Sequence, residues 1–215
     1  PVCEQFGTWL AGFLTGDWGR SFATGEPVAA DLLGRLPWSF AIGTAGLALA
    51  VGTGFALGYR AAFQPHGVAD RASRLLAVGG QALPAFAVGL AFLWLFAVEL
   101  RLVRPLTGPP AERLVLPVLL VALFSVGGVA RVARAAFAEV AAAPFMRTAL
   151  AKGLSPAAAL WRHGRRHAGL TIVAAMTPEL AWVLGGTAVA EIVFGIPGLS
   201  DRVVGGLGGV PAERR

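Results

Sequence analysis

Charged side chains are scarce in this sequence of 215 residues, at 14%, whereas hydrophobic residues make up 56% and the mean hydropathy is +0.68. An ordinary globular domain carries about 25% charged residues, so the composition argues against most soluble folds. Intrinsic disorder is excluded because it requires low hydrophobicity. Cysteine is nearly absent as well. Cys3 is the only one, which excludes an internal disulfide and argues against a cysteine-based metal cluster.

Long apolar runs with few or no charges are what the sequence does contain. Residues 38–59 and 75–98 hold no charged residue, and residues 168–190 hold a single acid, Glu179. A helix of about 20 apolar residues crosses a bilayer core of about 30 Å. The fold class predicted is therefore an all-α polytopic membrane protein. Its expected spans lie at approximately 38–59, 75–98, 114–133 and 168–190.

These runs predict three parts in the chain: an external segment (1–36), a transmembrane domain (37–200) and a Gly-rich tail (201–215). Pro37 marks the expected start of the first helix, since proline is tolerated in a first helical turn. Pro84 lies inside the second expected span, where it predicts a kink.

The placement of basic residues predicts which side of the membrane each connection faces. Segments 60–74 and 131–167 together contain ten Lys and Arg against two acids, whereas segment 1–36 contains two Arg against four acids. By the positive-inside rule the two basic segments are cytoplasmic. The formal net charge of +6 is therefore assigned to membrane orientation and lipid headgroups, not to nucleic-acid binding.

The region 141–167 is too polar to span a membrane and too apolar to be a plain linker. Phe145 to Lys152 reads as a short helix stopped by Gly153, a residue favoured at helix C-termini. Ser155 is placed to cap a second helix whose first residue is Pro156. The sequence thus predicts an elbow of two short amphipathic helices. Whether this elbow lies on the membrane surface or binds a partner protein stays open.

The elbow carries a recognisable motif. It reads Arg147-Thr148-Ala149-Leu150-Ala151-Lys152-Gly153-Leu154-Ser155, followed by Arg162-His163. This motif resembles the EAA-like motif in the inner-membrane permease subunits of ABC importers, in the dipeptide/oligopeptide/nickel branch. The external segment Gly16-Asp17-Trp18-Gly19-Arg20-Ser21, the segment Leu83-Pro84-Ala85-Phe86 and the turn Pro197-Gly198-Leu199 are similar to other signatures of that family.

The resemblance implies the type I ABC importer transmembrane-domain fold, with about four spans present of an expected six, and hence a truncated chain. It implies a transport subunit with no catalytic residues and no cofactor, in a bacterial or archaeal cytoplasmic (inner) membrane. The implied partners are ABC ATPase subunits, a second homologous permease subunit and an extracytoplasmic substrate-binding protein. Di- or oligopeptides are the implied cargo. A nickel or metal-chelate permease and a truncated, non-transporting scaffold subunit stay open as alternatives.

The resemblance also assigns the elbow as the part that couples to the ATPase. Phe145, Ala149 and Leu150 are expected to fill a groove on that partner, and Arg147 and Lys152 to make polar contacts with it. Thr148, Gly153 and Ser155 complete the expected ATPase-coupling site. No Gly-x-x-x-x-Gly-Lys-Ser/Thr phosphate loop occurs in the sequence, so ATP hydrolysis is expected in separate subunits.

Glu179 is unusual because an ionisable group at the centre of a span costs roughly 2.5–3.5 kcal/mol on insertion scales. It is a candidate for the substrate pathway, binding a cationic group, or else makes a structural hydrogen bond. Pro84 is the second candidate for that pathway.

The external motif Gly16, Asp17, Gly19 and Ser21 either contacts the substrate-binding protein or stabilises a turn. His163 and His167 lie at i and i+4, a spacing that can hold a metal. No carboxylate or cysteine accompanies them, so no metal site is expected.

Overall fold

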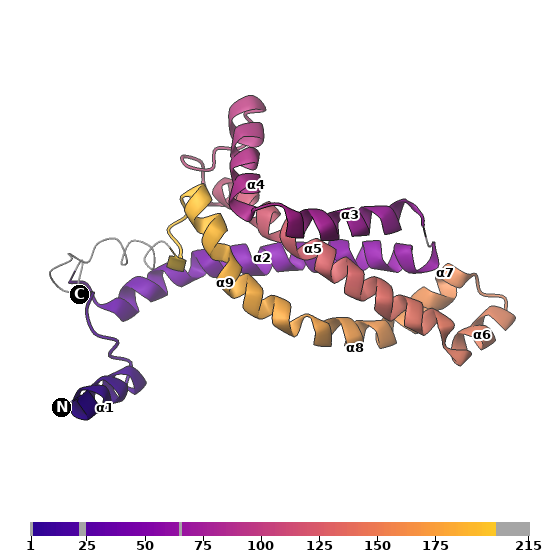
Figure 1. Ribbon diagram of the computed structural model, residues 1–215, viewed down its shortest axis with the longest axis horizontal. Helices are drawn as coiled ribbons and strands as arrows, with labels where there is room; N and C mark the ends of the chain where they lie inside the picture. The colour runs from indigo at the N-terminus through magenta and orange to yellow at the C-terminus, as the bar shows by residue number, and fades with distance from the viewer. Residues whose placement is uncertain (1, 22–24, 65, 201–215) are drawn as a thin grey trace.

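The computed structural model describes residues 2–21, 25–64 and 66–200. Within these ranges the chain is almost entirely helical, and a single isolated bridge joins Arg20 to Pro27. The helices α2, α3 and α8 run along the long axis of the molecule, α5 crosses them obliquely, and α4 projects away from the axis (Figure 1). The helices α6 and α7 form the end of the molecule opposite α1. The expected tail at 201–215 lies outside the described residues.

Two long helices form the frame of the fold, α2 (Val28–Phe63) and α5 (Pro110–Ala142). Both are long and apolar enough, by length and composition, to cross a membrane, and they contain the residues of the expected spans at 38–59 and 114–133. The expected helix start at Pro37 is wrong, because α2 begins nine residues earlier and Pro37 lies inside it. A proline inside a helix removes one backbone hydrogen bond but does not always end the helix.

Small residues let α2 and α5 approach each other closely. A Cβ atom added to Gly58 would lie 2.5 Å from the Cβ of Ala133, and one added to Gly54 would lie 2.7 Å from the Cβ of Val129. Membrane helices associate through such backbone approach, since lipid provides no hydrophobic drive between them. Gly54 and Gly58 therefore hold the central contact of the fold.

The second expected span is broken at Pro84. The helix α3 (Val68–Ala82) ends there, and α4 (Ala85–Phe92) continues into the π-helix η1 (Leu93–Glu99). The two halves meet at 108°, so the predicted kink is confirmed and is sharper than an ordinary proline bend. If this bent pair counts as one span, the described residues contain up to three candidate spans.

The fourth expected span, 168–190, is not a single helix. It is divided at Met176 between α8 (Arg165–Ala175) and α9 (Thr177–Phe194). The sequence explains the break, because a proline occupies the first turn of α9 and cannot donate a backbone hydrogen bond to the preceding turn.

Buried side chains form two clusters along the bundle. One joins α2 and α5 to the elbow region and includes Phe137, Met146, Leu160 and Ile172. The other joins α2, α5 and α9 at the opposite end and includes Ile42, Leu116 and Phe194. At that opposite end the turn around Pro197 closes over Glu191, whose carboxylate accepts a 2.8 Å hydrogen bond from the amide of Ser200.

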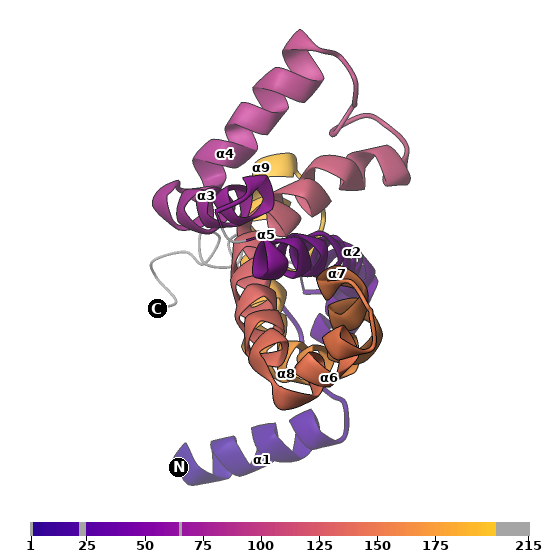
Figure 2. The ribbon, with the colours of Figure 1, turned by 90° about the vertical axis from the view of Figure 1, so that its right-hand side faces the viewer.

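The first helix, α1 (Val2–Leu14), is set apart from the bundle and has no buried residue. The view along the long axis shows α1 from its side, whereas α2 is seen end-on (Figure 2). The helix α1 therefore lies across the direction of α2. The expectation of an external segment at 1–36 did not include a helix here.

Candidate functional site

The elbow predicted from the sequence is present. The helix α6 (Pro144–Ala151) follows α5 after an extended Ala143, and α7 (Pro156–Ala159) begins after four connecting residues. Gly153 has a φ of +86° in this connection, a conformation that residues with a Cβ adopt only at a cost. The Ser155 hydroxyl accepts a 3.3 Å hydrogen bond from the amide of Ala158, which confirms Ser155 as the N-cap.

The helix α6 has one face toward the bundle and one toward the outside. Met146 is 3% exposed and Ala149 is 6% exposed, and both belong to the buried cluster with Phe137. This corrects the expectation that Ala149 fills a groove on a partner, because it already packs inside its own chain. The other seven residues of the expected coupling site are exposed: Phe145, Arg147, Thr148, Leu150, Lys152, Gly153 and Ser155.

An aromatic cluster anchors the elbow to the two long helices. Phe137 of α5 packs edge-on against Phe55 and Tyr59 of α2, at ring-centre distances of 5.1 and 5.4 Å. Trp161, in the π-helix η2 (Leu160–Gly164), lies 5.5 Å from the Tyr59 ring. The Tyr59 hydroxyl donates a 2.8 Å hydrogen bond to the carbonyl of Ala157 in α7. The elbow is thereby attached to both spans by rings and by one polar contact.

Sequence reasoning did not assign a role to these rings. Trp161 is half-exposed, with the Arg165 guanidinium 5.5 Å from its ring centre. Tyr59 is the single tyrosine of the chain and stands at the end of an apolar run. Buried tyrosines usually form a hydrogen bond through their hydroxyl. The position of Tyr59 was therefore the available signal for a hydrogen bond at this end of the helix.

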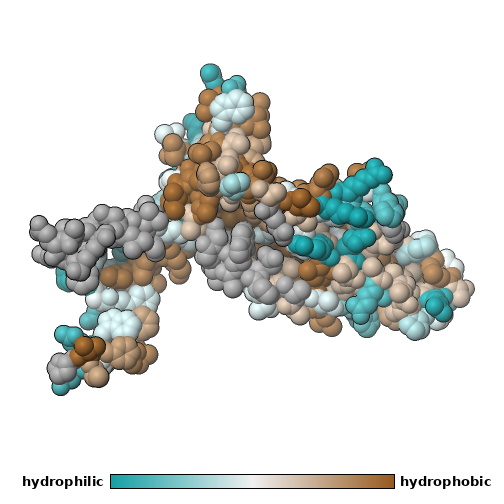
Figure 3. Space-filling model, in the orientation of Figure 1, coloured by the Kyte–Doolittle hydropathy of each residue, from teal (hydrophilic) through white to brown (hydrophobic). Residues whose placement is uncertain are grey.

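An ion-pair cluster lies near the same end of the bundle. The Asp70 side chain is fully buried in the first turn of α3, and its Oδ1 lies 2.8 Å from Nε of Arg134 in α5. Its other oxygen accepts a 3.0 Å hydrogen bond from the His66 amide and pairs with Arg74. Asp70 thus ties the α2–α3 turn to α5. Hydrophilic side chains gather over this end in Figure 3, whereas hydrophobic ones cover the middle.

The external motif builds a turn in this structure. Gly16 and Gly19 have φ values of +87° and +74°. Between them, a carboxylate oxygen of Asp17 accepts a 3.0 Å hydrogen bond from the Gly19 amide. The Ser21 amide donates a 2.9 Å hydrogen bond to the carbonyl of Glu26. These contacts account for the motif as a turn-former; a contact with a substrate-binding protein stays a prediction.

Of the two substrate-pathway candidates, only Pro84 has a side chain among the described residues. Pro84 is exposed at the break between α3 and α4. Glu179 falls in the first turns of α9, and its side chain lies outside the described residues. Within the described ranges, no group of three or more His, Cys, Asp or Glu is placed to hold a metal ion.

Long apolar helices with a polar elbow between the third and fourth expected spans are the features of an integral membrane protein. The family model for the inner membrane component of binding-protein-dependent transport systems matches residues 54–210. The chain belongs to this family, and it is an ABC transporter permease subunit of the inner membrane.

Two curated relatives fit this assignment. The chain is 32% identical to a probable peptide ABC transporter permease, y4tP of Sinorhizobium fredii, over 95% of this chain and 68% of the relative. It is 34% identical to the glutathione transport system permease GsiC of Pectobacterium atrosepticum, over 95% of this chain and 67% of the relative.

Proposed function

We propose that this chain forms part of the path by which short peptides cross the inner membrane, powered by separate ATPase subunits. The names of its relatives support a peptide cargo, since one is a probable peptide permease and the other a glutathione permease. Glutathione is itself a small peptide, so both names point to one chemical class. A nickel or metal-chelate cargo is not favoured by these relatives.

The observation that carries the proposal is the two-faced elbow. Its outward face presents Phe145, Leu150 and Lys152, whereas its inward face is fixed by Met146 and Ala149. An exposed apolar pair flanked by cations suits a groove with an acidic rim on a partner protein. The ATPase subunit is the proposed occupant of that outward face.

The anchoring of the elbow supports a transmission role. When the ATPase subunits close, an elbow held by the Tyr59–Ala157 hydrogen bond and the Phe137 ring contacts moves together with α2 and α5. Such rigid-body motion of packed elements is a common way to pass a change between distant sites. A loosely attached loop would absorb the movement instead.

Further parts of the proposal concern partners and the pathway. Large exposed apolar side chains cover α3, α4 and η1, among them Leu75, Phe86 and Trp94. This surface supports contact with lipid or with a second permease subunit.

Glu179 is proposed to bind the cationic amino terminus of the peptide, with Pro84 shaping the path. Loss of uptake in Glu179→Gln, with normal assembly, is the expected result for that role.

The experiment that tests the function is uptake by a reconstituted transporter. The complete transporter is reconstituted in liposomes from the permease, a sister permease, the ATPases and the binding protein. A radiolabelled dipeptide and ATP are then supplied. ATP-dependent accumulation of the dipeptide supports the proposal. Accumulation of a nickel chelate alone would favour the metal alternative. ATP hydrolysis without accumulation of either would favour a scaffold subunit.

A further inference from the structure

The helix α1 and the turn that follows it carry a continuous row of aromatic rings, and no residue of α1 is buried. We define the aromatic row as Phe6, Trp9, Phe13 and Trp18. Successive ring centres lie 6.0, 5.5 and 5.7 Å apart. Phe6 and Trp9 are 58% and 57% exposed. Phe13 and Trp18 are exposed as well, so the row is a preformed apolar surface among the described residues.

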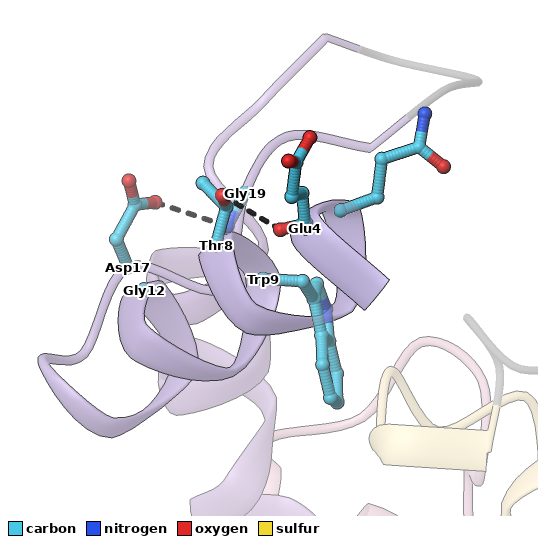
Figure 4. Close-up of a pocket in the computed structure, with 7 residues that line it drawn as sticks. Glu4, Thr8, Trp9, Gly12, Asp17 and Gly19 are labelled. Atoms are coloured by element: carbon cyan, nitrogen blue, oxygen red, sulfur yellow. Dashed lines mark hydrogen bonds between the residues drawn. The ribbon is translucent and has the colours of Figure 1, made fainter. Parts of the chain in front are cut away.

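The opposite side of α1 is polar. Figure 4 shows the Trp9 indole pointing away from the side on which Glu4 and Asp17 carry their carboxylates. The Thr8 hydroxyl donates a 2.9 Å hydrogen bond to the carbonyl of Glu4 on that polar side. A shallow pocket is lined by polar residues of this side together with Trp9 of the aromatic row: Glu4, Gln5, Thr8, Trp9, Gly12, Asp17 and Gly19. The helix is thus amphipathic along its whole length.

The orientation of α1 suits a membrane surface. It lies across the direction of α2, and the chain returns from it to the start of α2 through the bridge between Arg20 and Pro27. Since α2 crosses the bilayer, a helix lying across it at its beginning runs parallel to the membrane plane. Trp18 is held in the row by a 3.3 Å hydrogen bond from its indole to the carbonyl of Phe13. Tryptophan is enriched at the level of lipid headgroups.

We propose that α1 lies in the headgroup region of the membrane surface where α2 begins, with the aromatic row in lipid and the polar side in water. An amphipathic helix in this position buries its apolar face roughly 5–10 Å into the boundary. No Lys or Arg occurs in residues 1–19, which contain Glu4 and Asp17. The binding is therefore hydrophobic in origin, and anionic lipid does not strengthen it.

The test places nitroxide labels on the full chain in phosphatidylcholine nanodiscs. Cys3→Ser removes the only native cysteine. Leu10→Cys then puts a label beside the aromatic row without removing a ring, and Thr8→Cys puts a matched label on the polar side. Collisions with molecular oxygen report lipid, and collisions with a nickel chelate report water. The expected oxygen-to-nickel accessibility ratio is several-fold higher at position 10 than at position 8.

Each outcome decides the proposal. High nickel accessibility at both positions would place the row in water and overturn it. Low accessibility to both reagents at position 10 would mean that a protein covers the row, which also overturns it. A ratio that rises when phosphatidylglycerol is added would contradict the hydrophobic origin of binding. The readout needs no transport, so it is independent of the proposed function.

Discussion

The Tyr59 hydroxyl in α2 donates a 2.8 Å hydrogen bond to the carbonyl of Ala157, 98 residues later in the chain. This contact joins the end of a membrane-crossing helix to the second elbow helix. It is reinforced by the Trp161 ring 5.5 Å from that of Tyr59. The elbow is therefore tied to the frame of the bundle by these contacts, as the proposed coupling role requires.

Tyr59→Phe is expected to loosen this connection while leaving the ring contacts in place. A net hydrogen bond contributes about 1 kcal/mol, so the protein should still fold and assemble. The measurement is dipeptide uptake per ATP hydrolysed in proteoliposomes, and this ratio should fall several-fold. Thr53→Val is the matched control, because the Thr53 hydroxyl bonds only to backbone of its own helix. An unchanged ratio in Tyr59→Phe would argue against transmission through this contact.

Gly153→Ala tests the turn between the two elbow helices. At a φ of +86°, with no atom within 4 Å of an added Cβ, the substitution strains the backbone without a steric clash. The left-handed conformation costs an L residue about 1–2 kcal/mol. We expect weaker binding of the ATPase to the assembled permease, measured by co-purification. Gly169→Ala, at an open helical position in α8, should bind normally; equal binding by both variants would contradict the role of the turn.

Gly58→Ala tests the close approach of α2 and α5. The added Cβ would meet the Cβ of Ala133 at 2.5 Å and the amide nitrogen of Arg134 at 2.7 Å, so the helices must separate. Overpacking of this kind typically costs about 1–3 kcal/mol. Thermal denaturation in detergent should begin several degrees lower. Gly52→Ala, on the same helix, is the control, because no atom lies within 4 Å of the added Cβ. A similar fall in denaturation temperature in that variant would rule out the packing explanation.

Asp70→Asn tests the ion-pair cluster at the α2–α3 turn. Asparagine keeps the size of the side chain but removes the charge that faces Arg134 and Arg74. The turn should become more susceptible to protease, because α3 loses its polar attachment to α5. Limited proteolysis of the membrane-embedded protein measures this directly. Arg71→Gln removes an exposed cation from the same helix and should leave the cleavage pattern unchanged. Equal protection of Asp70→Asn and the unmodified chain would dismiss the tethering role.

The local features of the elbow were predictable from the sequence. Gly153 and Ser155 act through backbone conformation and capping within a few residues of themselves, so their positions specify the turn and the second helix. The break at Pro84 follows in the same way from the missing amide hydrogen of proline. The family motif added the expected role, which local rules alone left open between membrane and partner.

Contacts between distant segments were not predictable in the same way. Ala149 belongs to the family motif but faces the bundle, because α6 packs against Phe137 of α5. The local sequence of α6 does not show that this distant residue is its neighbour. Tyr59 acquires its partner from α7 for the same reason. Pro37 was read as a helix start, yet α2 runs through it, since proline is compatible with both positions.

The outward face of the elbow is the proposed binding surface for the ATPase. It is tested most directly by cysteine cross-linking in the assembled complex, on the Cys3→Ser background, with cysteines placed across the partner groove. Leu150→Cys, on the exposed face of α6, should cross-link to the ATPase, whereas Ala149→Cys, on the buried face, should not. Absence of any cross-link from position 150 or position 145 in a complex that still contains the ATPase would contradict the account.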